Sequence, residues 1–274
     1  MFKYVIFLLL LMPVNLLAQD IRAGAILPLS GNFASYGNEI RDGLSLAIED
    51  AKAKDVSVSL TLEDLPKPGQ QAIVALKKLI FQDKIDLLAG NFFNPAMVSM
   101  APILNKSEVV GFHTAVADDL ILSSGDYVFS VNARTKDEAQ LISERMKSRG
   151  ANNIAVVAVA TSFGEEYLRN VVQSFSTLGG KIVMQDTTPL DEVDFKTLCG
   201  RIRASKVDAV FAGYFGVLLG NFVKQLRQAG VTAPVFTVYE AEDFSVVDVA
   251  GELLNGVEYF IPDGAQNNPS WLSF

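Results

Sequence analysis

Small polar residues, amides and aromatic rings gather in six loops, and each loop follows a segment that we expect to be a β-strand. The six loops are 30–37, 90–95, 113–117, 161–165, 213–216 and 239–242. Hydroxyls, amides, rings and single acids together suit the gripping of a small organic molecule. The sequence has no Gly-x-Ser-x-Gly elbow, no Gly-x-Gly-x-x-Gly, no phosphate-binding Gly-Lys-Ser/Thr and no His-Glu-x-x-His. We therefore predict a binding protein with no catalytic residue. A hydrolase that uses carboxylates alone stays open as an alternative.

Metal, redox and nucleic-acid chemistry find little support in the composition. The 274 residues include one cysteine, Cys199, and one histidine, His113, which excludes an internal disulfide and leaves too few ligands for a Cys/His zinc site. Lys and Arg number 23 against 31 for Asp and Glu, a formal charge of −8, and no basic run interrupts this acidic balance. We expect no metal, no cofactor and no nucleic-acid partner.

The first 18 residues predict a secretory signal peptide. Lys3 supplies a positive charge, residues 4–12 form an apolar run, and the small residue Ala18 ends the segment. The uncharged stretch 4–18 is shorter than the roughly 18 to 20 residues that span a bilayer, so an uncleaved anchor is the weaker alternative. Cleavage after Ala18 or Gln19 would leave a periplasmic chain with no stable membrane insertion.

Strand-type and helix-type hydrophobic patterns alternate from Ile21 almost to the end, which predicts an α/β fold with mostly parallel sheets. The expected strands are 23–27, 56–62, 85–89, 109–112, 127–131, 154–160, 181–185, 209–212, 234–239 and 257–261. The expected helices are 38–53, 69–81, 95–105, 135–147, 164–178, 195–204, 217–229 and 246–254.

Turn residues at 123–126 predict a boundary between two lobes, with 19–126 as the first lobe and 127–261 as the second lobe with hinge strands. Thr135 and Glu138 have the spacing of a capping box. Cys199 shares a helix face with apolar residues and is expected to be buried. Ligands of parallel α/β sheets bind beyond the carboxyl ends of the strands, where the six loops gather.

Several stretches resemble the type I periplasmic binding proteins of the branched-chain amino-acid (Leu/Ile/Val) family. They are Gly24-Ala25-Ile26-Leu27-Pro28-Leu29-Ser30-Gly31, Tyr36-Gly37, Phe163-Gly164-Glu165, Asp194-Phe195, Ala212-Gly213-Tyr214 and 247–256, in the family's order and spacing. The resemblance covers nearly all of 21–262. It implies two Rossmann-like lobes joined by hinge strands, which trap a small ligand as they close and deliver it to an inner-membrane ABC permease.

Carried over position by position, the resemblance implies a set of ligand-binding residues. They are Tyr36, Asn91, Asn94, Thr114, Ala115, Phe163, Tyr214 and Glu240. Glu240 corresponds to the acid that holds a ligand ammonium. Three positions depart from the family pattern: the family's serine is replaced by Asn94 or deleted, its threonine is replaced by Ala117, and its tyrosine by Phe163. We therefore expect an amino-acid-like, amide or organic-acid ligand.

The resemblance also implies a return of the chain toward the first lobe, to which only 262–274 correspond here. A first lobe left incomplete would expose apolar faces. Two further hypotheses stay open besides a solute-binding protein: a ligand-sensing regulator of the same fold with no transport role, and a fragment that binds nothing.

Overall fold

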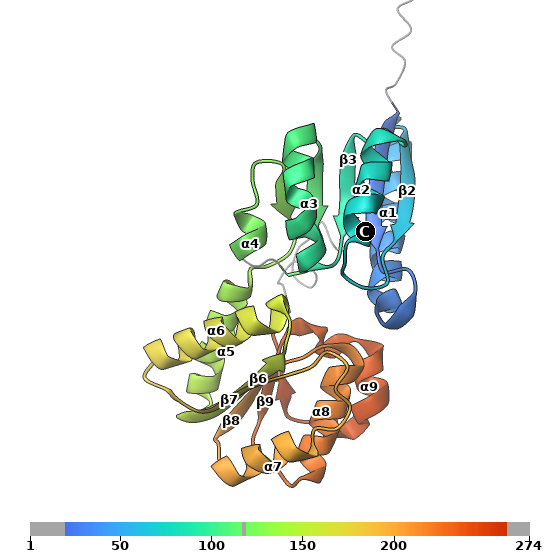
Figure 1. Cartoon of the computed structure of the whole chain (residues 1–274). Coiled ribbons are helices and arrows are strands. Elements are labelled where there is room, and N and C mark those ends of the chain that lie inside the picture. The colour runs from blue at the N-terminus through green and yellow to red at the C-terminus, as the bar shows by residue number, and fades with distance from the viewer. Residues whose placement is uncertain (1–19, 117–118, 262–274) are drawn as a thin grey trace, which may run out of the picture.

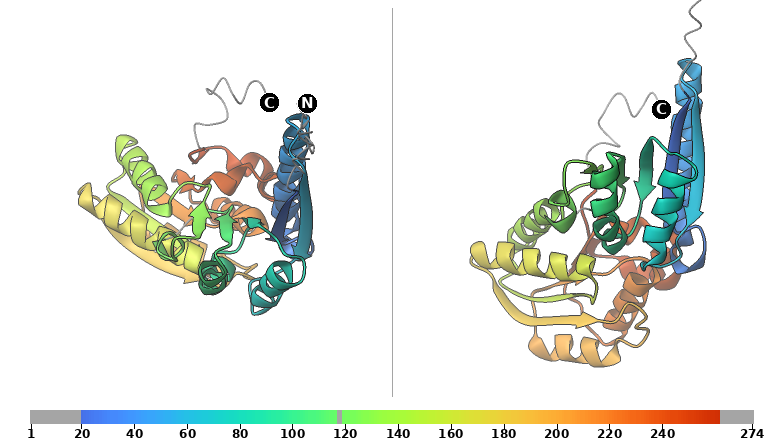
Figure 2. Two further views of the ribbon diagram at one scale, coloured as in Figure 1. Left: turned by 90° about the horizontal axis from the view of Figure 1, so that it is seen from above. Right: turned by 45° about the horizontal axis from the view of Figure 1, so that its top comes forward.

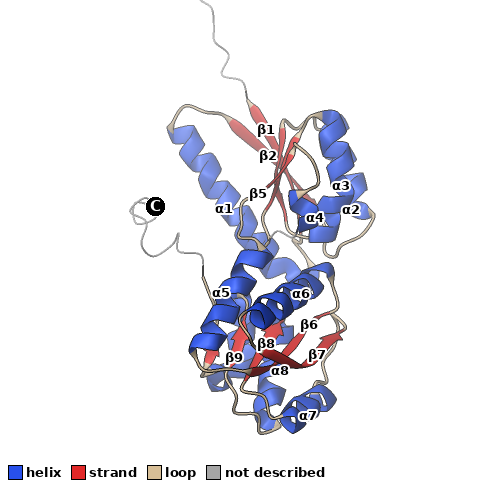
Figure 3. Cartoon of the chain, turned by 90° about the vertical axis from the view of Figure 1, so that its left-hand side faces the viewer, coloured by secondary structure: helices blue, strands red, loops and turns tan. Residues whose placement is uncertain are grey.

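Two five-stranded parallel sheets organise the chain, as the alternating patterns predicted (Figure 1). The computed structural model describes residues 20–116 and 119–261, so the predicted signal peptide 1–18 and the segment 262–274 lie outside the described residues. The strand order is β2-β1-β3-β4-β5 in one sheet and β10-β9-β8-β6-β7 in the other. Each sheet with its helices forms one lobe, and Figure 3 shows the first lobe above the second.

The first lobe contains five strands, four helices and a 3₁₀ turn among its described residues. The strands are β1 Ile21–Leu27, β2 Val58–Asp64, β3 Leu87–Asn91, β4 Val110–His113 and β5 Val128–Ser130. The helices are α1 Ala34–Ala53, α2 Gln71–Phe81, α3 Asn94–Ser107 and α4 Asp119–Leu122, and the 3₁₀ turn η1 is Gly31–Phe33.

The second lobe repeats the strand–helix pattern. Its strands are β6 Asn153–Val159, β7 Lys181–Thr188, β8 Ala209–Gly213, β9 Val235–Thr237 and β10 Val257–Glu258. Its helices are α5 Thr135–Ser148, α6 Ser162–Thr177, α7 Lys196–Ser205, α8 Gly216–Gln228 and α9 Phe244–Ala250, with 3₁₀ turns η2 Tyr239–Glu242 and η3 Gly251–Leu254.

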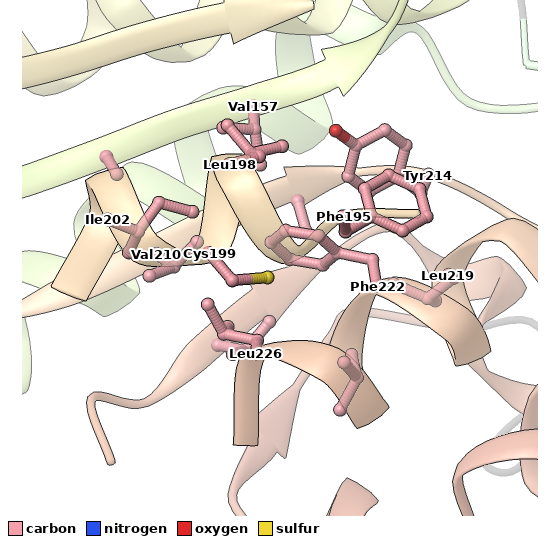
Figure 4. Packing of buried hydrophobic residues seen from close by; sticks show 14 of the residues in the cluster. Val157, Phe195, Leu198, Cys199, Ile202, Val210, Tyr214, Leu219, Phe222 and Leu226 are labelled. Atoms are coloured by element: carbon pink, nitrogen blue, oxygen red, sulfur yellow. The ribbon is translucent and has the colours of Figure 1, made fainter. Parts of the chain in front are cut away.

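Apolar clusters cover both faces of the second sheet. Strands β6 and β8 are buried along nearly their whole length, as expected for parallel strands between two helical layers. Cys199 lies in the cluster beneath α7 and α8 (Figure 4), which confirms the expected burial. Burial raises the pKa of the Cys199 thiol to about 12, so this side chain acts as a small hydrophobe.

The first sheet has a closed face and a partly open one. Helices α2 and α3 cover the face that carries Ile26, Leu88 and Val128. Because side chains alternate along a strand, Phe129 points to the opposite face, on which α1 packs over β1 and β2. Phe129 is 49% exposed and Val131 65% exposed, so this face bears open apolar surface in the described part of the chain.

The chain crosses between the lobes at 131–134. Strand β5 pairs with β4, which extends the first sheet to Ser130, beyond the boundary expected at 126. At the crossing, the Asn132 amide donates to the Thr114 carbonyl (3.4 Å) and to the Tyr239 hydroxyl (3.2 Å), and thereby ties the two lobes together.

The capping-box prediction was wrong. Helix α5 already includes Thr135, and the side chain of the cap residue Arg134 accepts no hydrogen bond from the helix backbone but donates to the Asp137 carboxylate (2.8 Å). The Thr135 hydroxyl instead donates to Glu166 across the α5–α6 contact, and Glu138 accepts a hydrogen bond from the Tyr167 hydroxyl. Packing between two helices thus uses the side chains that the spacing had assigned to a cap.

Candidate functional site

An aromatic pocket lies between the two lobes at the carboxyl ends of the strands. The hollow measures about 640 Å³ including its mouth, within the usual range for small-molecule sites. Helices α3 and α6 approach one another beside it (Figure 2). Its lining is Phe33, Tyr36, Pro68, Phe92, Phe93, Asn94, Pro95 and Ala115 from the first lobe and Thr161, Ser162, Phe163, Leu190 and Phe215 from the second.

Six aromatic rings form a continuous network around this pocket. Tyr36 stacks on Phe92 with ring centroids 5.1 Å apart and planes at 21°. Phe33 contacts Phe215 at 5.9 Å, which joins a ring of the first lobe to a ring of the second. Phe215 in turn meets Phe163 edge to face at 5.4 Å. Flat apolar walls of this kind favour a planar or aromatic ligand body.

Two glycines set the positions of Tyr36 and Phe163. Gly37 follows Tyr36 in the first turn of α1, and a Cβ on it would lie 2.0 Å from the Pro28 carbonyl oxygen. Gly164 follows Phe163 in the first turn of α6, and a Cβ there would lie 2.0 Å from the Val159 carbonyl oxygen. In both lobes, an absent side chain lets a helix start directly against the end of the preceding strand, and the neighbouring ring then projects into the pocket.

The polar side chains of the aromatic pocket carry no charge. Asn94 is already engaged at both ends: its Nδ2 donates to the Val116 carbonyl (3.2 Å) and its Oδ1 lies 3.0 Å from Nε2 of the buried His113. Thr161 caps α6 by accepting from the Gly164 N–H at 3.3 Å. The Ser162 hydroxyl is buried and has no hydrogen-bond partner among the described residues. Ser162 therefore offers a donor that a ligand can use.

A second hollow of about 770 Å³, the acidic pocket, adjoins the first and shares Tyr36, Phe92 and Ala115 with it. Its other lining residues are Glu39, Ile40, Thr114, Tyr239, Glu242, Asp243 and Phe244. Burial and the nearby carboxylates of Asp243 and Asp42 raise the pKa of Glu39. Acids from both lobes therefore face one another in this hollow, which favours positive charge.

The structure brings most of the sequence-predicted residues to these two hollows. Tyr36, Asn94, Ala115 and Phe163 line the aromatic pocket, and Thr114 lines the acidic pocket.

Asn91 and Glu240, two further members of the predicted set, are not among the described lining residues of either hollow. Asn91 is fully buried behind the lining, where its carbonyl accepts from the Thr114 hydroxyl (3.0 Å). Glu240 lies in η2, between acidic-pocket residues, but its side chain is outside what the structure describes, as is all of Ala117.

Tyr214 requires a correction. Its side chain is fully buried in the core of the second lobe, where its ring centroid lies 5.5 Å from that of Phe195 and 5.0 Å from that of Phe222 (Figure 4). Tyr214 lines neither hollow. Its hydroxyl bonds to Thr188 at 3.2 Å. The next residue, Phe215, caps α8 in an extended conformation and points to the pocket instead. Adjacent extended residues face opposite sides, so an offset of one position exchanges a core ring for a pocket ring.

Sequence reasoning also missed Phe33, Phe215 and Ser162 as pocket residues. All three stand in the six loops that the sequence singled out. Loop positions could thus be read from the sequence, whereas the direction of each side chain depends on where its helix begins. No group of His, Cys, Asp and Glu that could hold a metal ion occurs among residues 20–116 and 119–261. Within the same residues, no helix is long and apolar enough to cross a membrane.

Comparison with known proteins relates the chain to one family. A family model described as "Periplasmic binding protein" matches residues 20–267. The Leu/Ile/Val-binding protein of Citrobacter freundii is 25% identical over 250 residues, which are 88% of this chain and 67% of that protein. These matches agree with the prediction of a binding protein rather than an enzyme.

Solved structures share the fold at low identity. A solute binding protein from R. palustris in complex with benzoate has a TM-score of 0.83 at 22% identity. The match covers 93% of this chain and 72% of the chain of that protein. Another from R. palustris, in complex with 4-hydroxybenzoate, has a TM-score of 0.75 at 21% identity and covers 81% of this chain. The match spans only 62% of that second protein, so this chain corresponds to less than two thirds of it.

Proposed function

This chain belongs to the periplasmic binding protein family, and we propose that it captures a small solute with an aromatic ring between its two lobes. The observation that carries the proposal is the aromatic pocket, whose rings come from both lobes and whose side chains are uncharged. An aromatic ring would contact Phe92 and Tyr36 on one side and Phe163 and Phe215 on the other.

A ligand that contacts both lobes would favour the arrangement in which the lobes are closed around it. A ligand favours the closed arrangement only by the contacts that it makes there and not in the open one. Rings of the second lobe, Phe163 and Phe215, face those of the first lobe across the pocket, so separation of the lobes would remove half of the ligand's contacts.

Delivery of the solute to an inner-membrane ABC permease completes the proposal. The family, the names of the relatives and the signal peptide predicted from residues 1–18 support this step and a periplasmic location. A ligand-sensing regulator with the same pocket is the alternative. The two differ in whether loss of the protein abolishes uptake of the solute by cells.

An amino-acid ligand is the second candidate, and the acidic pocket favours it. Glu39, Glu242 and Asp243 would attract an ammonium group, while an apolar side chain would lie in the adjoining aromatic pocket. The relatives named Leu/Ile/Val-binding proteins point in the same direction.

Isothermal titration of the purified protein tests the proposal and separates the two candidates. We expect benzoate or 4-hydroxybenzoate to bind more tightly than leucine, and Phe163→Ala to weaken binding at least tenfold. Phe129→Ala is the matched control, because this ring is half exposed on the first sheet and lines neither hollow. Absence of heat with all aromatic and aliphatic probes would refute the proposal, and preference for leucine would favour the second candidate.

A further inference from the structure

We infer that the solute carries a carboxylate, which binds at the start of α6 to the Ser162 hydroxyl and the N–H groups of Ser162 and Phe163. This inference rests on the proposed function, since it orients the same solute in the aromatic pocket. It assigns the anion to the second lobe, at a residue, Ser162, that is not among the ligand-binding positions that the family resemblance implied.

Helix α6 presents free donors at this point. Thr161 caps the helix through its side chain, and its carbonyl accepts from the Glu165 N–H at 2.9 Å. Ser162 and Phe163 are the first two residues of the helix, and N–H groups in the first turn have no carbonyl partner within it. The aligned peptide dipoles add positive potential at the same end. Both residues line the aromatic pocket, so the start of α6 lies at its wall.

The Ser162 side chain is the second, independent indication. Its oxygen is buried, and it has no hydrogen-bond partner among the described residues. A buried hydroxyl without a partner is unfavourable for the folded protein, and a ligand oxygen that accepts from it removes this penalty. A carboxylate has two oxygens and can take the hydroxyl and a main-chain N–H together.

Negative charge in the acidic pocket disfavours a solute whose carboxylate points toward the first lobe. The acidic pocket beyond Tyr36 and Phe92 contains Glu39, Glu242 and Asp243, which would repel a carboxylate. Asn94, at the first-lobe side of the pocket, already uses its amide on Val116 and His113.

The nearest acid on α6 does not oppose this assignment. Glu165 is exposed and lines a separate surface hollow with Arg169 rather than the aromatic pocket. The start of α6 is therefore the part of the pocket that suits an anion.

Titration with benzoate and with its neutral analogue benzamide tests the inference in the full-length protein. We expect benzoate to bind at least tenfold more tightly than benzamide. Ser162→Ala should weaken benzoate about tenfold and benzamide less than threefold, because a hydrogen bond to a charged group is the stronger one. Ser162→Asp should abolish benzoate binding and spare benzamide, and an acid in the first turn favours the helix, so this variant remains folded.

Ser176→Ala, an exposed serine near the other end of the same helix, is the matched control and should change neither affinity. Equal affinity for benzoate and benzamide, or benzoate binding that is unchanged in both Ser162 variants, would overturn the inference while leaving the proposed function intact. Failure of both ring compounds to bind the unaltered protein would overturn the proposed function as well.

Discussion

Replacement of Tyr214 by phenylalanine distinguishes a core residue from a ligand-binding one. The substitution removes one hydroxyl and its 3.2 Å hydrogen bond to Thr188, while the ring stays packed against Phe195 and Phe222. A buried neutral hydrogen bond contributes about 1 kcal/mol. The Thr188 hydroxyl, which is also buried, loses its partner, so we expect the free energy of unfolding to fall by about 1–2 kcal/mol in total.

Urea denaturation measures this loss. With a slope of roughly 2–3 kcal/mol per molar, the midpoint should fall by about half a molar and the slope should stay unchanged. Tyr259→Phe is the matched control, because its hydroxyl bonds to Glu242 at the surface, where a comparable loss is small.

Ligand affinity of the Tyr214→Phe variant shows whether the Tyr214 hydroxyl contacts the ligand. Tyr214→Phe should leave the dissociation constant for an aromatic probe within twofold of the unaltered protein, because Tyr214 lines neither hollow. A fivefold weaker dissociation constant together with an unchanged urea midpoint would mean that the hydroxyl contacts ligand, and the placement of Tyr214 in the core would be refuted.

Three further predictions concern stability. Burial raises the pKa of the Glu138 carboxyl to about 7, so the folded protein holds this proton more tightly than the unfolded chain, and stability falls as the pH rises from the ordinary carboxyl range through 7. Glu138→Gln should remove this pH dependence, and its free energy of unfolding at pH 8, measured by urea titration, should exceed that of the unaltered protein by up to about 3 kcal/mol. An equal pH dependence of stability in the two proteins would contradict this expectation. Gly37→Ala and Gly164→Ala should each lower the melting temperature and weaken solute binding, because the new methyl group would overlap a strand-end carbonyl; unchanged melting curves would exclude that contact. Glu258→Gln breaks ion pairs to two arginines that are about half exposed, so calorimetry should detect a loss below about 1 kcal/mol, and a larger loss would show that these pairs are better shielded from solvent than their exposure indicates.

The order of strands and helices could be predicted because hydrophobic periodicity reports which faces are buried. The run of apolar residues in β6 and the 3.6-residue period of α6 both reflect burial in a layered α/β lobe. The first residue of each helix was harder to predict from the sequence. The sequence pattern assigned residues 34–37 to a loop, yet α1 begins at Ala34, and Gly37 in its first turn lies against the Pro28 carbonyl.

The site was predictable at the level of loops and unpredictable at the level of side-chain direction. Tyr36 and Phe163, which the resemblance placed among the ligand-binding residues, line the aromatic pocket, and each precedes a glycine that fits against a strand end. Tyr214 and Phe215 are adjacent aromatics, and only the backbone conformation at the start of α8 determines which ring turns inward. The capping-box spacing of Thr135 and Glu138 failed for a related reason, since tertiary contacts with α6 compete for both side chains.

A crystal structure of the protein grown with 4-hydroxybenzoate tests the central claim most directly. We expect electron density for the ring between Phe92 of the first lobe and Phe163 of the second, with ring atoms within about 4 Å of both side chains. A ring bound outside the aromatic pocket, or one that contacts residues of a single lobe only, would contradict the claim that this protein captures an aromatic solute between its lobes.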